Sequence, residues 1–374
     1  MELLESSVRL ALLALCLAVA SSAQSPRARD IGIPFDGAPG PLNAITDVSG
    51  VTVGHTTLVV GDAVRTGVTA ILPRGLASAS DPVYAGWSSL NGNGEMTGTA
   101  WIEESGFLEG PVMITNTHSV GVVRDAVISW RIAVGAADAS GYWWSLPVVA
   151  ETWDGYLNDI NGFHVRAEHA HRALEEARGG AVAEGNVGGG TGMICYEWKG
   201  GIGSASRVVT HAVGPLTVGV LVQANFGLRD QLLIAGVPVG REIPEDRLWS
   251  RETGSIIVVV ATDAPLLPHQ LERLARRVPL GLARTGSVSG NGSGDLFLAF
   301  STANAGATRG RGKVTVDTIV NDALDGLFAA VVQATEEAIV NALVAAEDMT
   351  GRSGTVRALP HDRLQEVLRR FGRL

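Results

Sequence analysis

The sequence is poor in the residue types that cross-link or charge many proteins. Of its 374 residues, 5% are aromatic, 18% are charged and only two are cysteine. Cys16 lies in an apolar N-terminal run, and removal of that run would leave Cys195 as the only cysteine. A chain with one cysteine cannot form an intramolecular disulfide, so we expect its hydrophobic core to provide its stability.

Concentrated positive charge is also missing. The 38 Asp and Glu outnumber the 29 Lys and Arg, which gives a formal net charge of −9. The densest arginine clusters, residues 273–277 and 369–373, are interleaved with apolar residues as on ordinary helices. Because nucleic-acid-binding proteins gather basic residues on one surface, this composition argues against a nucleic-acid partner.

Several sequence signatures of catalysis are absent. There is no His-Glu-x-x-His, and His169 and His171 lie two residues apart on a predicted helix, where they diverge on a solvated face instead of gripping one metal. There is no Gly-x-Ser-x-Gly, which weakens an α/β-hydrolase interpretation. The glycine-rich residues 185–192 lack the strand before and the helix after that a dinucleotide loop requires. A turn or a close backbone approach explains those glycines better.

What the sequence does have is glycine and short apolar runs. Its 47 glycines are scattered through a chain that is 46% hydrophobic, which indicates many tight turns in an α/β protein. Short β-branched segments bounded by turns predict strands. These strands cover residues 51–60, 68–72, 111–115, 217–223, 255–261 and 296–301.

Helical patterns lie between the strands. Residues 164–178 carry charges around an Ala/Leu stripe, and residues 265–278 place leucines on one face after Asp263 as a plausible N-cap. Residues 322–348 are apolar nearly all round, which is typical of one or two buried helices. No repeat and no long linker divides the chain, so we expect one compact α/β domain over residues 24–374, with sheets sandwiched by helices.

The N-terminus predicts export. Residues 8–20 form an apolar run that is too short to span a bilayer comfortably, and the small residues 21–23 follow it. We interpret residues 1–23 as a signal peptide, although Glu2 and Glu5 are unusual in such a segment and an amphipathic helix is the alternative. The mature protein would then be periplasmic or secreted, with no membrane segment left after the signal is removed.

The segment from Glu252 to Asp263 places a Gly-Ser pair directly before a continuous apolar run. Taken as structure alone, it is a turn that enters a buried strand. It also suits an N-terminal nucleophile, because Gly254 can adopt the backbone dihedrals needed for attack by Ser255 on the preceding carbonyl. Cleavage would free an α-amine with a pKa of about 7.7–8.0, which can accept the Ser255 hydroxyl proton near neutral pH.

A second polar cluster occupies residues 290–295, immediately before the strand predicted at 296–301. Ser293 and Asp295 are two residues apart as the chain becomes extended, so their side chains point to the same face. A glycine-rich turn is the plain interpretation. A hydroxyl and a carboxylate on one face can also bind and orient a nearby serine or ammonium group.

These segments resemble the DmpA-type L-aminopeptidase/D-amino-acid esterases and the BapA-like β-aminopeptidases. The resemblance covers nearly all of the chain beyond about residue 30, in several long motifs that occur in the same order. The motifs are residues 43–55, 115–121, 151–165, 184–192, 222–227, 254–270 and 281–304.

The resemblance implies the four-layer αββα sandwich that this family shares with ornithine acetyltransferases, and a precursor cut between Gly254 and Ser255. The products would be an α chain of residues 24–254 and a β chain of residues 255–374. It also implies no metal and no cofactor, substrates that are short peptides, amides or esters with a free amino group, and a homo-oligomer of αβ units.

The resemblance further implies roles for single residues. Ser255 matches the nucleophile, and Ser293 and Asp295 match the serine and the acid beside it. Asn225 matches the asparagine that donates to the oxyanion, and Glu151 matches the acid that binds the substrate amine.

Two positions depart from the pattern, and two other functions stay open. Some members have Tyr in place of Trp153, and an indole N–H cannot transfer a proton as a phenol might. Others have Glu in place of Asp295. These departures bear on the preference among α-L, D and β residues more than on the mechanism. An acyltransferase of the ornithine-acetyltransferase type is one alternative, although those enzymes use a threonine nucleophile. An exported binding protein for amino compounds is the other.

Overall fold

The fold is described from a computed structural model. It describes residues 25–135, 144–252, 254–308 and 312–374. The predicted signal peptide, residues 1–23, lies outside the described residues, as does Thr253, two residues ahead of Ser255.

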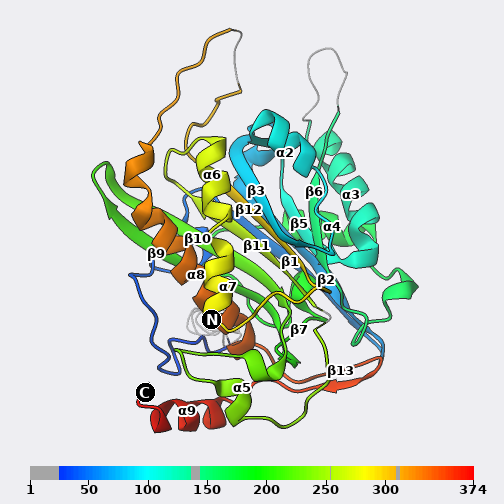
Figure 1. Cartoon of the computed structure of the whole chain (residues 1–374). Helices are drawn as coiled ribbons and strands as arrows, with labels where there is room; N and C mark the ends of the chain where they lie inside the picture. Colours follow the sequence, from blue (N-terminus) through cyan, green and yellow to red (C-terminus); the bar gives the residue numbers. More distant parts are fainter. Residues whose placement is uncertain (1–24, 136–143, 253, 309–311) are drawn as a thin grey trace, which may run out of the picture.

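Two large sheets organise the chain (Figure 1). The four-stranded sheet has the order β1 (Thr52–Val60), β2 (Val64–Leu76), β5 (Val112–Asn116) and β6 (Val148–Thr152). The six-stranded sheet has the order β4 (Phe107–Leu108), β3 (Val83–Gly92), β12 (Gly294–Ser301), β11 (Ser255–Thr262), β10 (Gly214–Asn225) and β9 (Gly201–His211). Within these sheets β5–β6 and β11–β12 are parallel pairs, and the other described pairs are antiparallel.

Helices cover the outer face of each sheet. The pair α3 (Val120–Ala133) and α4 (Ala167–Glu175) packs on the four-stranded sheet, while α6 (Pro268–Ala275) and α8 (Asp325–Val344) pack on the six-stranded one. Helix α7 (Val278–Arg284) packs on α8. The remaining described α-helices are α2 (Thr99–Ser105), α5 (Val239–Glu242) and α9 (His361–Arg370). Two hairpins pair β7 (Ile194–Cys195) with β8 (Trp198–Lys199) and β13 (Met349–Gly351) with β14 (Gly354–Val356).

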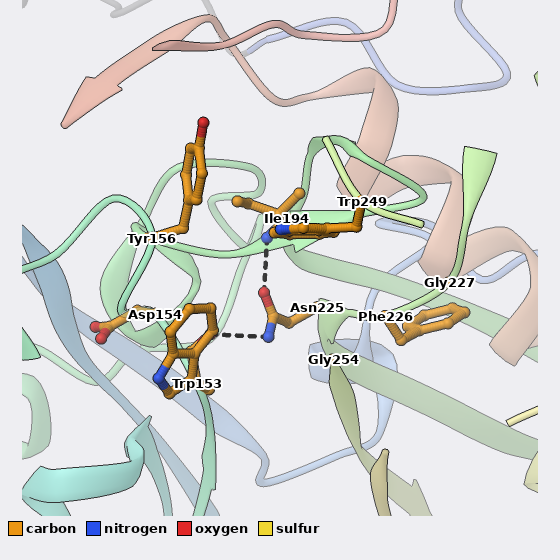
Figure 2. A pocket seen from close by; sticks show the side chains of 10 residues that line it. Trp153, Asp154, Tyr156, Ile194, Asn225, Phe226, Gly227, Trp249 and Gly254 are labelled. Atoms are coloured by element: carbon orange, nitrogen blue, oxygen red, sulfur yellow. Dashed lines mark hydrogen bonds between the residues drawn. The ribbon is translucent and has the colours of Figure 1, made fainter. Parts of the chain in front are cut away.

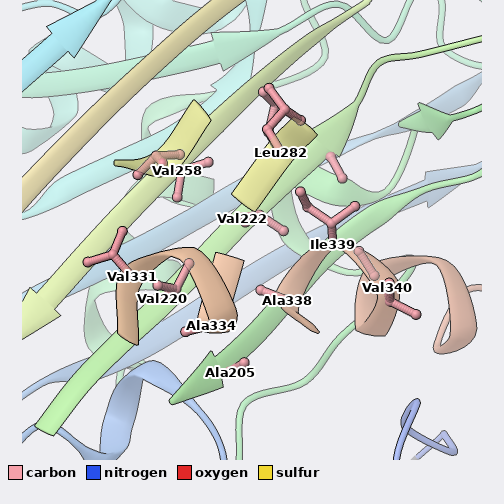
Figure 3. Packing of buried hydrophobic residues seen from close by; sticks show 14 of the residues in the cluster. Ala205, Val220, Val222, Val258, Leu282, Val331, Ala334, Ala338, Ile339 and Val340 are labelled. Carbon is pink, nitrogen blue, oxygen red and sulfur yellow. The ribbon is translucent and has the colours of Figure 1, made fainter. Parts of the chain in front are cut away.

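Strand β11 shows how the sequence produces the layers. All eight of its residues are buried, because both faces of the sheet are covered. Ile257 packs in the cluster between the two sheets, whereas its neighbour Val258 packs in the cluster under the helices. Figure 3 shows this second layer, where Val331 of α8 lies near Val220 and Val258 of the sheet. With a third cluster between the four-stranded sheet and α3 and α4, the predicted αββα order is confirmed.

The predicted strands are all present, and the three predicted helical segments differ from the structure in their bounds. The helix expected over 265–278 is present but shorter: α6 covers Pro268–Ala275, and a second helix, α7, begins at Val278. Asp263 is not an N-cap, because its Oδ1 accepts from the Thr217 N–H at 2.7 Å and joins the ends of two strands. The helix expected over 164–178 is limited to α4, and the apolar run at 322–348 forms one helix, α8.

Helix α8 is long and apolar enough to cross a membrane by length and composition alone. In the structure, however, it lies against strands β9 and β10, and its residues contribute to the cluster under the helices. It is the core helix of this layer.

The glycine-rich segment is a close backbone approach, as predicted. Residues Gly188–Gly190 form a buried 3₁₀ turn that contacts β1 and β2 of the four-stranded sheet and β9 of the six-stranded sheet. A β-carbon on Gly189 would lie 2.2 Å from Gln223 Oε1, and one on Gly190 would lie 2.4 Å from the Ile202 nitrogen. Only a residue without a side chain fits at either position.

Candidate active site

The site is centred on Ser255, the first residue of β11. Its side chain is buried, and its Oγ accepts a hydrogen bond from the Gly294 N–H at 3.0 Å. The antiparallel register of β10 and β11 places Asn225 directly opposite Ser255. Side chains opposed in this way share a face of the sheet, so Asn225 and Ser255 lie close together.

Ser293 and Asp295 flank Gly294, the first residue of the neighbouring strand β12. The register of β11 and β12 pairs Ile256 with Asp295. Ser293 Oγ donates to Asp295 Oδ1 at 2.6 Å, and both side chains are buried. Burial raises the pKa of the Asp295 carboxyl, although the Ser293 hydrogen bond opposes this. The shared face predicted for Ser293 and Asp295 is therefore present. Gly294, which lies between them in the chain, donates its N–H to Ser255 Oγ.

Asn225 is held at both ends of its amide (Figure 2). Its Oδ1 accepts from the Ile194 N–H at 2.7 Å, and its Nδ2 donates to the Trp153 carbonyl at 2.9 Å. An amide nitrogen carries two N–H donors. One donor of Asn225 therefore remains for a further acceptor after these bonds are made.

A pocket lies beside Asn225 and the residue ahead of the serine (Figure 2). Trp153 is 40% exposed there, and the Tyr156 and Trp249 rings meet edge to face with their centroids 6.0 Å apart. The full lining is Trp153, Asp154, Tyr156, Gly192, Ile194, Asn225, Phe226, Gly227, Trp249 and Gly254. Trp153 and Tyr156, from the segment after Glu151, therefore form part of the pocket wall.

Glu151 differs from the other residues of that segment. It lies on β6 and is buried, and it does not line the pocket beside Asn225. Its carboxylate accepts from the Glu95 N–H at 3.0 Å and from the Thr117 hydroxyl. A β-carbon on Gly94 would be 3.3 Å from Glu151 Oε1 and 3.1 Å from the Gly294 α-carbon. Only a glycine thus separates Glu151 from the residue whose N–H binds Ser255.

Burial is the main cause of the pKa shifts of the carboxyl groups in this region. Burial raises the pKa of Glu151, against the opposing hydrogen bond from Thr117. Burial also raises the pKa of Asp154 to about 7, although Thr66 and Asn158 oppose it. Both shifts have the same cause, since a carboxylate loses its hydration in a buried position.

Sequence patterns did not reveal the anchor of the segment ahead of Ser255. Glu252 Oε1 accepts from the Gly227 N–H at 3.1 Å, and its Oε2 accepts from the Gly290 N–H at 3.0 Å. Glu252 thereby ties this segment both to the end of β10 and to the turn that carries Ser293. A lone glutamate in a polar stretch has no local signature of such a role.

Metal binding has no support in the part of the chain that the structure describes. No group of three or more His, Cys, Asp or Glu side chains there could hold a metal ion. His169 and His171 are both half-buried on α4, and His171 Nε2 lies 2.9 Å from Ser129 Oγ on α3. This contact packs α4 against α3.

Comparison with known proteins gives a consistent result. The model of the family described as peptidase family S58 matches residues 43–357. The chain is 55% identical over 383 aligned residues to the β-peptidyl aminopeptidase BapA of Sphingosinicella microcystinivorans, with 96% of each protein covered.

Solved structures agree in shape as well as in sequence. The L-aminopeptidase D-Ala-esterase/amidase of Ochrobactrum anthropi, described as a prototype of the serine aminopeptidases with a variant of the Ntn hydrolase fold, matches with a TM-score of 0.89 and 50% identity over 93% of this chain and 99% of that chain. A β-aminopeptidase of a Burkholderia species matches with a TM-score of 0.87 and 50% identity over the same shares.

Proposed function

The chain belongs to peptidase family S58, and on that premise we propose that it cuts its own Gly254–Ser255 bond and then uses Ser255 to release N-terminal residues. The observation that carries the proposal is the position of Ser255. It begins a buried strand, it faces Asn225, and its hydroxyl accepts the Gly294 N–H. Cleavage of the Gly254–Ser255 bond would make Ser255 an N-terminal residue whose side chain already lies opposite Asn225.

Family membership and the structural matches make the chain a serine aminopeptidase with the N-terminal-nucleophile hydrolase fold. They confirm this prediction over the acyltransferase alternative and over the binding-protein alternative. Peptides and amides are the substrates of such enzymes. We propose short peptides, amides and esters with a free amino group as the substrates of this one.

Self-cleavage needs no reactant other than water. The Ser255 oxygen attacks the Gly254 carbonyl carbon, and the bond from that carbon to the Ser255 nitrogen breaks. The hydroxyl proton passes to the departing nitrogen, which becomes the new α-amine. Water then hydrolyses the Gly254 ester, which leaves a carboxyl group on Gly254 and restores the serine hydroxyl.

Turnover follows the same chemistry on an external substrate. The neutral α-amine of Ser255 takes the hydroxyl proton as Oγ attacks the substrate carbonyl, and the leaving amine receives a proton as it departs. Ser293 and Asp295 orient that α-amine. The remaining N–H of Asn225 stabilises the negative oxygen that forms during attack. Water then releases the acyl group as the free amino acid.

Substrate selection would rest on Glu151 and Trp153. A buried carboxylate next to the reaction centre favours a substrate ammonium and is left without a positively charged partner when that amine is acylated. Trp153 is the exposed aromatic face of the pocket beside Asn225. It would contact the side chain of the residue that is released.

We further propose that residues 1–23 direct export to the periplasm or beyond the cell, and that the mature αβ units assemble into a homo-oligomer. The support for export is the apolar run followed by small residues at 21–23. The support for assembly is the resemblance of the motifs to a family of oligomeric enzymes.

The test is the intact mass of purified protein. We expect two chains that separate only in denaturant, the smaller one beginning Ser-Ile-Ile-Val, and we expect Ser255→Ala to remain one inactive chain. Cleavage of Ser255→Ala at the same bond, or activity of that variant against aminoacyl nitroanilides, would place the nucleophile elsewhere.

A further inference from the structure

Lys199 is a fully buried lysine whose charge is held by backbone oxygens. It ends β8, and its Nζ donates to the carbonyls of Gly200 at 2.8 Å, Met193 at 2.9 Å and Gly190 at 3.2 Å. Among the residues that the structure describes, no carboxylate forms an ion pair with it. Three donors of an ammonium group meet three acceptors, so its hydrogen-bonding capacity is filled.

One of these carbonyls belongs to a peptide unit that also touches the active site. The Met193 carbonyl binds Lys199, and the N–H of the same Met193–Ile194 peptide donates to Asn225 Oδ1 at 2.7 Å (Figure 2). A positive charge on the oxygen side of a peptide polarises it and strengthens its N–H as a donor. Lys199 and Asn225 therefore sit at the two ends of one polarised peptide.

Further hydrogen bonds around Lys199 fix the position of the Met193–Ile194 peptide. The Gly190 carbonyl ends the glycine-rich turn that precedes Met193, and the Gly200 N–H donates back to the Met193 carbonyl at 2.9 Å. The Met193 carbonyl thus receives both an ammonium N–H and a backbone N–H. This double anchoring leaves the Ile194 N–H little freedom to turn away from Asn225.

We propose that Lys199 is a positioning residue that holds the Asn225 amide, through the Met193–Ile194 peptide, in the orientation that leaves one N–H free for the substrate oxyanion. The inference rests on the proposed role of Asn225. Burial lowers the pKa of Lys199 to about 7, and the buried Cys195 thiol is the titratable neighbour that opposes this shift. The three carbonyls favour the charged form that the positioning role requires.

The test is a double-mutant cycle on the processed enzyme, with active sites counted by intact mass. Asn225→Ala should lower kcat by roughly 10²–10³-fold, as expected for one preorganised donor. Lys199→Met, which keeps the length of the side chain but no donor, should lower kcat by about tenfold or more with KM changed less than about threefold. The double variant should lose no more than Asn225→Ala alone, because Lys199 acts only through that amide.

Controls separate positioning from general stability. Lys199→Gln keeps two N–H donors without the charge, so it should retain more kcat than Lys199→Met, and it replaces that variant if Lys199→Met fails to fold. Val331→Ala weakens the core under α8. The Val331→Ala variant should lower the melting temperature and leave kcat unchanged.

The outcomes separate failure of the Lys199 inference from failure of the proposed oxyanion role of Asn225. If the effects of Lys199→Met and Asn225→Ala multiply in the double variant, Lys199 does not act through Asn225 and this inference fails alone. If Asn225→Ala keeps full kcat, the proposed oxyanion role fails and the inference fails with it.

Discussion

The carbonyl oxygen of Asn225 occupies the space that a side chain on Gly254 would need. A β-carbon built on Gly254 would lie 1.9 Å from that oxygen and 2.7 Å from the Phe226 α-carbon. The glycine before the serine is therefore required by a close approach between strands. This differs from the sequence prediction, which attributed it to unusual dihedrals, because Gly254 is not among the described residues with positive φ.

Gly254→Ala should therefore slow self-cleavage strongly, since either the scissile segment or the end of β10 must shift to make room. The measurement is the fraction of uncut chain against time after synthesis. Gly121→Ala on α3 is the matched control, because a β-carbon there meets nothing within 4 Å, and it should process normally. Processing of Gly254→Ala at the wild-type rate would mean that the two strands are not held this closely.

Glu252 should matter for self-cleavage and not for turnover. Glu252→Ala removes both hydrogen bonds that tie the segment ahead of Ser255 to Gly227 and Gly290. We expect a longer processing half-time, and a kcat per cut active site close to that of the wild type. Glu104→Ala, an exposed glutamate on α2, is the control. A variant that cuts itself at full speed would show that these bonds do not position the bond for attack.

Glu151→Gln should raise KM for substrates with a free amino group and leave cleavage at Gly254–Ser255 intact, because processing involves no substrate amine. N-acetylated substrates should be nearly inert with the wild-type enzyme, since a buried carboxylate left without a counter-charge costs about 1–3 kcal/mol or more. The measurement is a pair of steady-state assays on one nitroanilide with and without the acetyl group. Equal turnover of the two would remove Glu151 from substrate recognition.

Asp154 should make stability depend on pH. Its pKa of about 7 in the folded chain lies above the ordinary value, so the folded chain binds this proton more tightly than the unfolded chain. Its contribution to stability therefore falls as pH rises from about 4 to about 7 and is constant above that. In an uncut Ser255→Ala background, Asp154→Asn should raise the melting temperature relative to Asp154, and the gain should grow from pH 5 to pH 8.

The chemistry around Asp154 favours that outcome. Asp154 Oδ2 is buried without a hydrogen-bond donor among the described residues, and Asp154→Asn removes the charge that this buried position disfavours. Asp125→Asn, on the exposed face of α3, is the control and should show no such trend. A gain that stays flat across the pH range would show that Asp154 is already ionised in the folded chain at pH 5.

Much of the fold could be predicted because β-strands and helices leave local periodic signals. Strand β11, which begins at Ser255, is covered on both faces, so residues 256–261 are all apolar and the strand is plain in sequence. Strand β3 is the opposite case. It mixes glycine, serine and aromatic residues in Val83–Gly92, has no clear alternation, and drew no prediction. Its place is decided by pairing with β12, more than 200 residues away.

The sequence by itself determined the local chemistry: a Gly-Ser pair at the head of an apolar strand, and a serine and an acid two residues apart before another. These features depend on neighbours along the chain, where the geometry of an extended backbone sets which side chains share a face. Tertiary structure alone decided that Asn225 opposes Ser255, that Glu252 ties its own segment to two others, and that Lys199 lies behind Ile194. Those relationships join residues whose separation in sequence carries no periodic signal. They exist only once strand order and register have brought the segments together.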